Sequence, residues 1–238
     1  MRTLLTLTLL ACAGCDTRTA TVRVTIPDLD GIETPVPGLQ VIFLPYDRDS
    51  LVRAFEAKAP TPRPHTKELD SLFREFAAPY REFIRIATVV DRLRRERDSL
   101  TQALGTAAAG PRLAAITDSI GRLTPAETAA NATLKRTRER LGPAIDRLRS
   151  DATKWESDTY RDYQSAVRGL GIRSFANPVA DTTDALGWAT IALTNGTWWA
   201  TARSIDPGDP YREWYWNVRI DGDTVALSPR TGRFRPRY

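Results

Sequence analysis

The sequence predicts an α+β fold, in which an antiparallel β-sandwich carries an inserted antiparallel α-helical hairpin of the coiled-coil type. Apolar and polar residues alternate in residues 20–47 and again in 172–238, as half-buried strands require. Between these segments, residues 48–171 space their apolar side chains three and four apart, which is the helical period. We therefore expect both ends of the chain to build one sandwich domain and the middle to form a helical insertion.

Composition excludes several functions. The chain has 238 residues, 42% hydrophobic and 26% charged, which is typical of a folded protein. One histidine and two cysteines are too few for a histidine-rich or cysteine-rich metal site or for a disulfide framework. No apolar run reaches the roughly 18 residues of a membrane-spanning helix. The net charge of +5 is diluted among acidic residues, so we expect no nucleic-acid partner.

The N-terminus has the pattern of an export signal. Arg2 precedes a short leucine-rich segment, which is followed by the small residues and cysteines of LACAGC at 10–15. This pattern resembles the signal peptide and lipobox of bacterial lipoproteins, a family in which the cysteine is lipidated and becomes the mature N-terminus. Cys15 directly follows Ala-Gly, whereas Cys12 has a leucine three positions before it. We prefer Cys15 and keep Cys12 as the alternative.

The resemblance implies a location. Residues 1–15 would be removed or lipidated, so they are left out of the fold. The mature protein would be held by its lipid at the inner or outer membrane of the cell envelope, facing the periplasm or the surface. At most one further cysteine would remain, so we expect no intramolecular disulfide.

Two strands are expected before the helices. Val22, Val24 and Ile26 share one face of the first strand, and residues 27–31 form a turn. The second strand occupies about 39–44, and prolines at 35 and 37 keep its start out of the sheet.

The inserted segment predicts a short helix at about 50–58, a proline-rich linker at 59–64, and two long helices joined near Gly110. About forty residues at 1.5 Å each would make an arm of roughly 60 Å. Pro79 and Pro143 are equidistant from the apex, which predicts one shared bend. A second break is expected at Pro125, which suits the first turn of a new helix.

The C-terminal part returns to strands. Alternating segments at 187–193, 198–202, 214–220 and 224–227 are separated by turn residues. Asn195-Gly196 predicts a hairpin, and Asp221-Gly222 predicts a tight turn. A basic tail ends the chain, with Arg230, Arg233, Arg235 and Arg237.

Three segments of the predicted strands resemble one known fold. Residues 36–44 (VPGLQVIFL), 182–189 (TTDALGWA) and 193–200 (LTNGTWWA) are similar to carboxypeptidase-regulatory-like, transthyretin-like (prealbumin-like) domains. The resemblance covers about 110 residues in two pieces and departs from the family by the long helical insertion. It implies a β-sandwich with an accessory role and no chemistry of its own.

The chemistry-bearing residues are better explained structurally. His65 lies in the proline-rich linker without a recognisable partner, so we expect it to be solvated. Asp28 and Asp30, and likewise Asp221 and Asp223, sit in turns too short to surround a calcium ion. We therefore expect no catalytic residue, no metal and no cofactor.

A cluster of tryptophans is the strongest candidate binding surface. Trp198 and Trp199 are adjacent and should face opposite sides of a strand, whereas Trp214 and Trp216 should share one side. One set is expected to fill the sandwich core. The other is covered by the base of the helical arm, is exposed as a platform for a sugar or peptide, or contacts another protein; covering by the arm is the simplest interpretation.

Three classes of function remain open. We favour a non-enzymatic cell-envelope lipoprotein, anchored to a membrane through its lipid, whose arm or sheet binds an envelope protein or acts structurally. The alternative is a carbohydrate-binding module that uses exposed tryptophans. An enzyme with a carboxylate pair such as Glu75 and Glu82 is less favoured, because these residues fit a charged outward helix face.

Overall fold

The structure is a computed structural model, and it describes residues 17–108, 110–174 and 176–238. Cys12 and Cys15, and with them the expected signal and lipobox, lie outside the described residues. The described chain is an α+β fold of two β-sheets and four helices, and the helices lie between β3 and β4 in the sequence, as expected. Among the described helices, none combines the length and the apolar character that crossing a bilayer requires.

The first sheet is built around the longest N-terminal strand. Its members are β1 (Thr17–Pro27), β2 (Glu33–Pro35), β5 (Trp188–Thr194) and β8 (Thr224–Leu227). β1 pairs antiparallel with β5 and β2, but β8 runs parallel to β1 with Val22 opposite Val225. The expected antiparallel sandwich therefore contains one parallel pair.

The second sheet is antiparallel throughout and has the order β4-β3-β6-β7-β9. Its strands are β3 (Gln40–Leu44), β4 (Val179–Thr182), β6 (Trp199–Asp206), β7 (Asp209–Arg219) and β9 (Arg233–Pro236). The two sheets enclose one apolar core, to which the first contributes Val22, Val24 and Leu227 and the second Phe43 and Trp216.

Two expected turns prove to be crossovers. β5 and β6 flank Asn195-Gly196 but belong to different sheets, and β7 and β8 flank Asp221-Gly222 in the same way. The prediction of a hairpin at Asn195-Gly196 is therefore wrong, whereas the short turn at Asp221-Gly222 leads directly into β8 but joins strands of different sheets. Trp198 gives the physical reason at the first: its ring is buried between the sheets, and its Nε1 donates to the Thr194 carbonyl at 2.9 Å, which folds the chain over the core.

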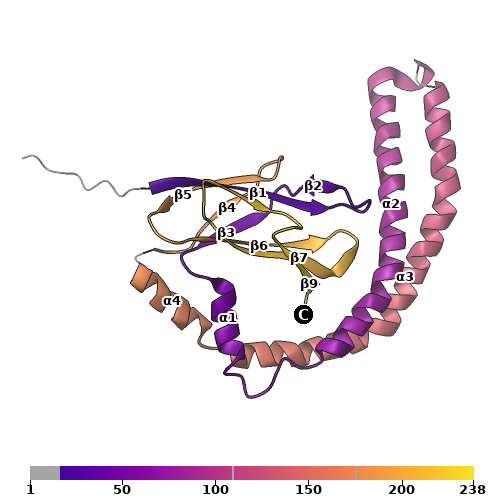
Figure 1. The fold of residues 1–238 in the computed structure, drawn as a ribbon. Helices are drawn as coiled ribbons and strands as arrows, with labels where there is room; N and C mark the ends of the chain where they lie inside the picture. Colours follow the sequence, from indigo (N-terminus) through magenta and orange to yellow (C-terminus); the bar gives the residue numbers. More distant parts are fainter. Residues whose placement is uncertain (1–16, 109, 175) are drawn as a thin grey trace, which may run out of the picture.

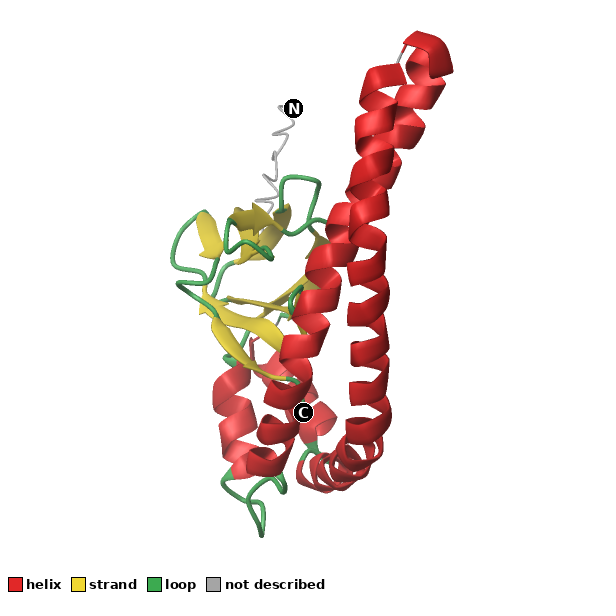
Figure 2. Cartoon of the chain, turned by 90° about the vertical axis from the view of Figure 1, so that its right-hand side faces the viewer, coloured by secondary structure: helices red, strands yellow, loops and turns green. Residues whose placement is uncertain are grey.

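The four helices lie on the side of the molecule formed by the second sheet. They are α1 (Arg48–Glu56), α2 (Thr66–Ala108), α3 (Gly110–Thr159) and α4 (Tyr163–Ser174). α2 and α3 form an antiparallel hairpin that curves beneath the sandwich and then extends well past it (Figures 1 and 2). α3 continues through Pro125, so the expected break there is wrong. Burial of its apolar seam against α2 outweighs the hydrogen bond that a proline removes.

The base of the hairpin is fixed to the sandwich by aromatic residues. Phe73 of α2 stacks on Tyr211 of β7 with ring centroids 4.5 Å apart, and Phe76 packs edge-on against the same ring. Arg149 of α3 lies over both Phe73 and Tyr211. Tyr238 donates to Asp70 at 3.0 Å. The arm therefore packs on the sheet at its base and projects from it farther along.

The distal half of the arm is held by its own seam. Val90 of α2 and Ile116 of α3 are buried. Ion pairs cross between the helices at Arg94–Glu127 (3.2 Å) and Glu96–Arg112 (2.5 Å). Such exposed pairs contribute little each, about 0–1 kcal/mol, so the apolar seam carries most of the stability of this half.

Candidate functional site

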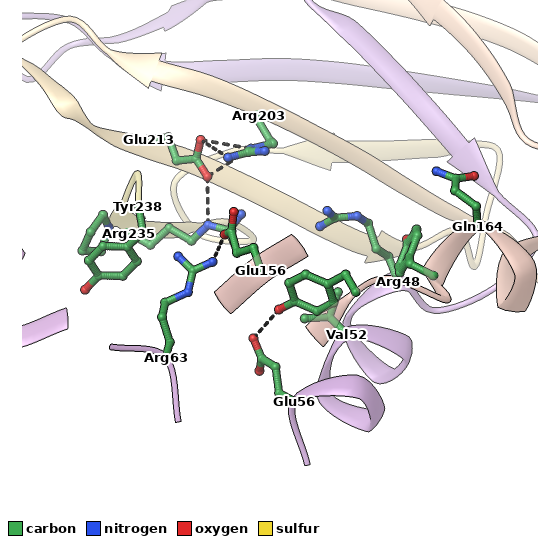
Figure 3. A pocket seen from close by; sticks show the side chains of 13 residues that line it. Arg48, Val52, Glu56, Arg63, Glu156, Gln164, Arg203, Glu213, Arg235 and Tyr238 are labelled. Carbon is green, nitrogen blue, oxygen red and sulfur yellow. Dashed lines mark hydrogen bonds and ion pairs between the residues drawn. The ribbon is translucent and has the colours of Figure 1, made fainter. Parts of the chain in front are cut away.

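A cavity lies between the outer face of the second sheet and the helices that cover it. Its volume is about 570 Å³. β6, β7 and β9 form its floor, and α1, the linker after it, the end of α3 and the start of α4 form its walls (Figure 3). The lining residues are Arg48, Val52, Glu56, Arg63, Glu156, Tyr160, Tyr163, Gln164, Arg203, Glu213, Arg235, Pro236 and Tyr238.

Strand register gathers the polar side chains of the floor. Arg203 pairs across the sheet with Tyr215, Glu213 with Arg235, and Tyr215 with Arg233. Alternation along β7 sends Glu213 and Tyr215 to the outer face, whereas Trp214 and Trp216 belong to the core side. One strand thus carries an apolar face and a charged face.

Glu213 is the electrostatic centre of the floor. Its side chain is 3% exposed and accepts from the Nε atoms of Arg203 (3.0 Å) and Arg235 (2.9 Å), with Arg237 at 3.9 Å. A buried carboxylate is tolerated when cations and hydrogen bonds balance its charge. Glu213 has three nearby arginines, and two of them donate hydrogen bonds to it.

Tyr215 joins the floor to α1. The guanidinium carbon of Arg235 lies 3.7 Å from its ring centroid, that of Arg233 5.2 Å away and that of Arg48 5.7 Å away. The hydroxyl donates to Asp49 Oδ1 at 2.6 Å, and burial raises the pKa of Tyr215 above its usual value. The tyrosine is therefore neutral near pH 7 and covered by cations.

The start of α1 is locked in place by Asp47. This residue is the N-cap, and its carboxylate accepts from the Asp49 amide (3.0 Å) and from Nδ2 of Asn217 in β7 (2.6 Å). Burial alone would raise the pKa of Asp47, but hydrogen bonds from Ser50 and Asn217 hold it below its usual value. The cap thereby fixes Arg48, the first residue of the helix, at the cavity.

The opposite wall is built from the linker and the end of the arm. Arg63 forms an ion pair with Glu156, and Tyr160 donates to Glu56 at 2.7 Å. Burial, assisted by the neighbouring Glu56, raises the pKa of Tyr160 to about 12. Burial and the hydrogen bond to Asp70 raise the pKa of Tyr238 likewise to about 12. Both hydroxyls are neutral hydrogen-bonding groups at neutral pH.

The four tryptophans are buried or half-buried in the structure. Trp198 is 3% exposed and Trp216 0%, because both rings fill the core between the sheets. Trp214 packs partly buried against that core, and Trp199 is half-buried on the opposite side of its strand. One set therefore fills the core, as expected, and Trp198 and Trp216 cannot belong to an exposed binding surface. The outer face beside Tyr215 is covered chiefly by α1 and arginines rather than by the arm.

The remaining sequence candidates have structural partners. His65 precedes α2 with a positive φ of 57°, and its Nε2 lies 3.2 Å from Asp151 of α3, so it is tied to the arm base rather than simply solvated. Asp28 accepts from the amides of Asp30 and Ile32 in a turn. Across the described residues, no three potential ligands among His, Cys, Asp and Glu gather in a metal-binding group.

Glu75 and Glu82 lie on the charged surface of α2, where Glu75 pairs with Arg140 and Glu82 with Arg85. They do not approach the cavity.

The cavity itself was missed by sequence reasoning. The signal was the alternation of Arg233, Arg235 and Arg237 with other residues, which marks a strand with one basic face. Chemically, the lining offers guanidinium and tyrosine donors around an open space, which suits binding. Comparison of the chain with protein-family models, curated proteins and solved structures found no match.

Proposed function

We propose that this protein is a non-enzymatic lipoprotein of the cell envelope, in which the sandwich carries a helical arm that binds another envelope protein. The supporting observation is the difference between the two halves of the arm. The base is fixed to β7 by Phe73, Phe76 and Tyr211, whereas the distal half extends past the sandwich with its own buried seam. A rigid mount and a long, charged, self-supporting extension suit a reaching or docking role.

The lipid anchor fits this arrangement. β1 begins at Thr17, so a lipid on Cys15 would hold the sandwich close to the membrane surface. The arm lies at the end of the sandwich opposite the start of β1 (Figure 1). An arm in that place can reach proteins away from the anchoring point.

The sandwich is further proposed to be transthyretin-like. Two of the segments that suggested this family meet in space: Thr183 Oγ1 donates to the Val36 carbonyl (2.6 Å) and accepts from the Leu39 amide (2.8 Å). Asp184 closes the following turn by accepting from the amides of Leu186 and Trp188. Such a domain serves as a stable mount for the arm.

The arm is tested by shortening it. Deleting residues 92–126 and joining the helices by about four glycine-rich residues retains Val90, Leu134 and the aromatic base. We expect a folded, membrane-anchored protein that no longer forms the cross-linked complexes of the full chain in intact cells. Retention of the same complexes would place binding on the sandwich and contradict the proposal. The double variant Glu75→Gln and Arg140→Gln, which alters one exposed pair near the base, is the matched control.

The anchor is tested separately. Replacing Cys15 by alanine should release the protein from membranes, and replacing Cys12 should not. If only the Cys12 variant is released, the lipidated residue is Cys12. If both variants remain on membranes, the lipoprotein interpretation fails.

A further inference from the structure

We propose that the cavity above the second sheet binds a small carboxylate or phosphate oxyanion, held by the guanidinium groups of Arg48, Arg203 and Arg235. This inference concerns a face of the molecule that the proposed arm function does not use, and it stands or falls independently of that function.

The dimensions suit a small molecule. Ligand sites usually enclose about 300–1,000 Å³, and this cavity has a volume of about 570 Å³. Val52, Pro236 and the rings of Tyr160, Tyr163 and Tyr238 give it apolar and aromatic walls, against which a sugar ring or another compact body can pack.

The charges of the lining favour an anion. Four arginines face three glutamates around the cavity. Each glutamate is already engaged: Glu213 is shared by Arg203 and Arg235, Glu156 pairs with Arg63, and Glu56 accepts from Tyr160. Each guanidinium group has five N–H donors, and the single Glu213 carboxylate accepts from both Arg203 and Arg235. Both arginines therefore keep N–H donors that can bind a further oxyanion.

Arg48 is the least compensated of the four. Within the described part of the chain, no carboxylate oxygen lies within 4.0 Å of its guanidinium nitrogens. Its Nη1 donates to the Tyr215 hydroxyl at 3.2 Å, and the group also lies near the Tyr215 ring. A half-buried guanidinium held by neutral partners gains most from an incoming anion, because that anion supplies the missing countercharge.

The arginines approach one space from different elements. Arg48 comes from the first turn of α1, Arg203 from β6 and Arg235 from β9. Figure 3 shows Arg48 extending from α1 toward the side on which Arg203, Glu213 and Arg235 lie. Arg235 lies over the Tyr215 ring and Arg48 donates to its hydroxyl, so one buried tyrosine positions both guanidinium groups before any ligand arrives. This preorganisation lowers the cost of binding.

The chemistry shared by the expected ligands is a carboxylate or phosphate oxyanion, which matches the planar fork of arginine. Titration calorimetry of the purified full-length protein can distinguish the two sources, with glucuronate and inorganic phosphate as probes and glucose as the neutral counterpart of glucuronate. We expect saturable binding of at least one oxyanion and none of glucose. Glucuronate binding identifies a carboxylate site, and binding of phosphate alone identifies a phosphate site. Failure of both oxyanions to bind at millimolar concentration, or equal binding of glucose, overturns the proposal.

Two variants locate the site. Arg48→Gln should weaken binding of the responding oxyanion about tenfold or more, since hydrogen bonds to charged groups contribute at least that factor. Arg168→Gln removes the same charge from the exposed face of α4 and should bind as the wild type does. Val52→Phe keeps every charge but narrows the cavity, so it should also weaken binding. Wild-type affinity in folded Arg48→Gln and Val52→Phe proteins would place the oxyanion elsewhere and refute the assignment.

Discussion

The two faces of β7 are stabilised in different ways, although they alternate along one strand. On the inner face, Trp216 is fully buried among aliphatic side chains of both sheets, and its Nε1 donates to the Ser228 carbonyl at 2.9 Å. On the outer face, Glu213 and Tyr215 are equally buried, but beneath arginines and α1. The inner face is stabilised by apolar packing. On the outer face, the charge of the buried Glu213 carboxylate is balanced by arginines.

This difference separates fold from function. The inner face depends on shape and tolerates no ligand, because its side chains fill the space between the sheets. The outer face keeps an open cavity beside its charges, where solvent or a small molecule can enter. We therefore expect substitutions on the inner face to cost more stability than those on the outer face.

The largest effect is expected for Trp216→Ala, which removes a fully buried indole from the centre of the core. The free energy of unfolding should fall by about 3–5 kcal/mol, as for other large aromatic truncations. Denaturant unfolding followed by circular dichroism measures it. Trp199→Ala, at a half-buried position, serves as the comparison and should cost clearly less. Equal losses in the two variants would show that full burial on the inner face does not make Trp216 more important for stability than the half-buried Trp199.

The inner face was largely predictable from the sequence. Alternation placed Val22, Val24 and Ile26 in the core, and it placed Trp214 and Trp216 on a shared side. Sequence spacing also predicted the helical hairpin and its place between the strands. These predictions succeeded because burial of one side of a strand or helix requires apolar residues at regular spacing, and such spacing can be read directly from the sequence.

The outer face was not predictable in the same way. Glu213 meets Arg203 and Arg235 through strand pairings between residues 10 and 22 positions apart, and α1 is joined to the same face by the Tyr215–Asp49 hydrogen bond, whose partners are 166 positions apart. The parallel β8 and the crossovers at Gly196 and Gly222 have the same origin, since a local turn motif does not state which sheet the next strand joins. The spacing of apolar residues along a strand identifies its buried side. Which residues of other segments pack against either side depends on the order of the strands and the placement of the helices.

The second largest effect is expected for Glu213→Gln. This change removes the buried carboxylate to which Arg203 and Arg235 donate, and loss of these charge-assisted hydrogen bonds should cost about 2–3 kcal/mol, because both guanidinium groups are partly exposed and remain solvated. Thermal and denaturant unfolding measure the loss. Glu75→Gln, in an exposed pair on the arm, should change stability by less than about 1 kcal/mol. A similarly small effect at Glu213 would mean that the outer charges do not hold the fold.

A smaller effect is expected for Gly232→Ala, which tests how closely the chain before β9 covers the inner face. A Cβ at this position would meet the Trp216 ring, with Cδ1 only 2.9 Å away. Displacing a packed indole should cost about 1–3 kcal/mol. Gly222→Ala adds the same methyl group where no atom lies within 4 Å, so its stability should change much less. Equal melting temperatures for the two variants would show that the indole moves without cost.

The smallest effect is expected at the other buried carboxylate of β7. Asp209 is 4% exposed, like Glu213, but in the described chain it has no cation within ion-pair distance; its Oδ1 accepts from the Tyr211 amide at 2.9 Å. Burial raises the pKa of Asp209, so ionising this carboxyl opposes folding. The stability that protonated Asp209 contributes to the folded protein is complete below the unfolded pKa of about 3.9. It is lost as pH rises through the higher pKa of the folded state.

Asp209→Asn should therefore stabilise the protein slightly at pH 7, by less than about 1 kcal/mol, because the amide oxygen can keep the Tyr211 hydrogen bond without a buried charge. The advantage should shrink as pH is lowered and disappear near pH 3, where the aspartate is protonated in both states. Unfolding free energies of the two proteins across this pH range test the sign. The same amide substitution at Glu213 should destabilise at pH 7, because it removes the carboxylate that pairs with Arg203 and Arg235. Opposite signs at two carboxylates of one strand would establish that compensation, rather than burial, decides whether a charge can remain inside this sheet. Destabilisation by Asp209→Asn at pH 7 would instead show that nearby Arg81 and Arg212 already compensate Asp209.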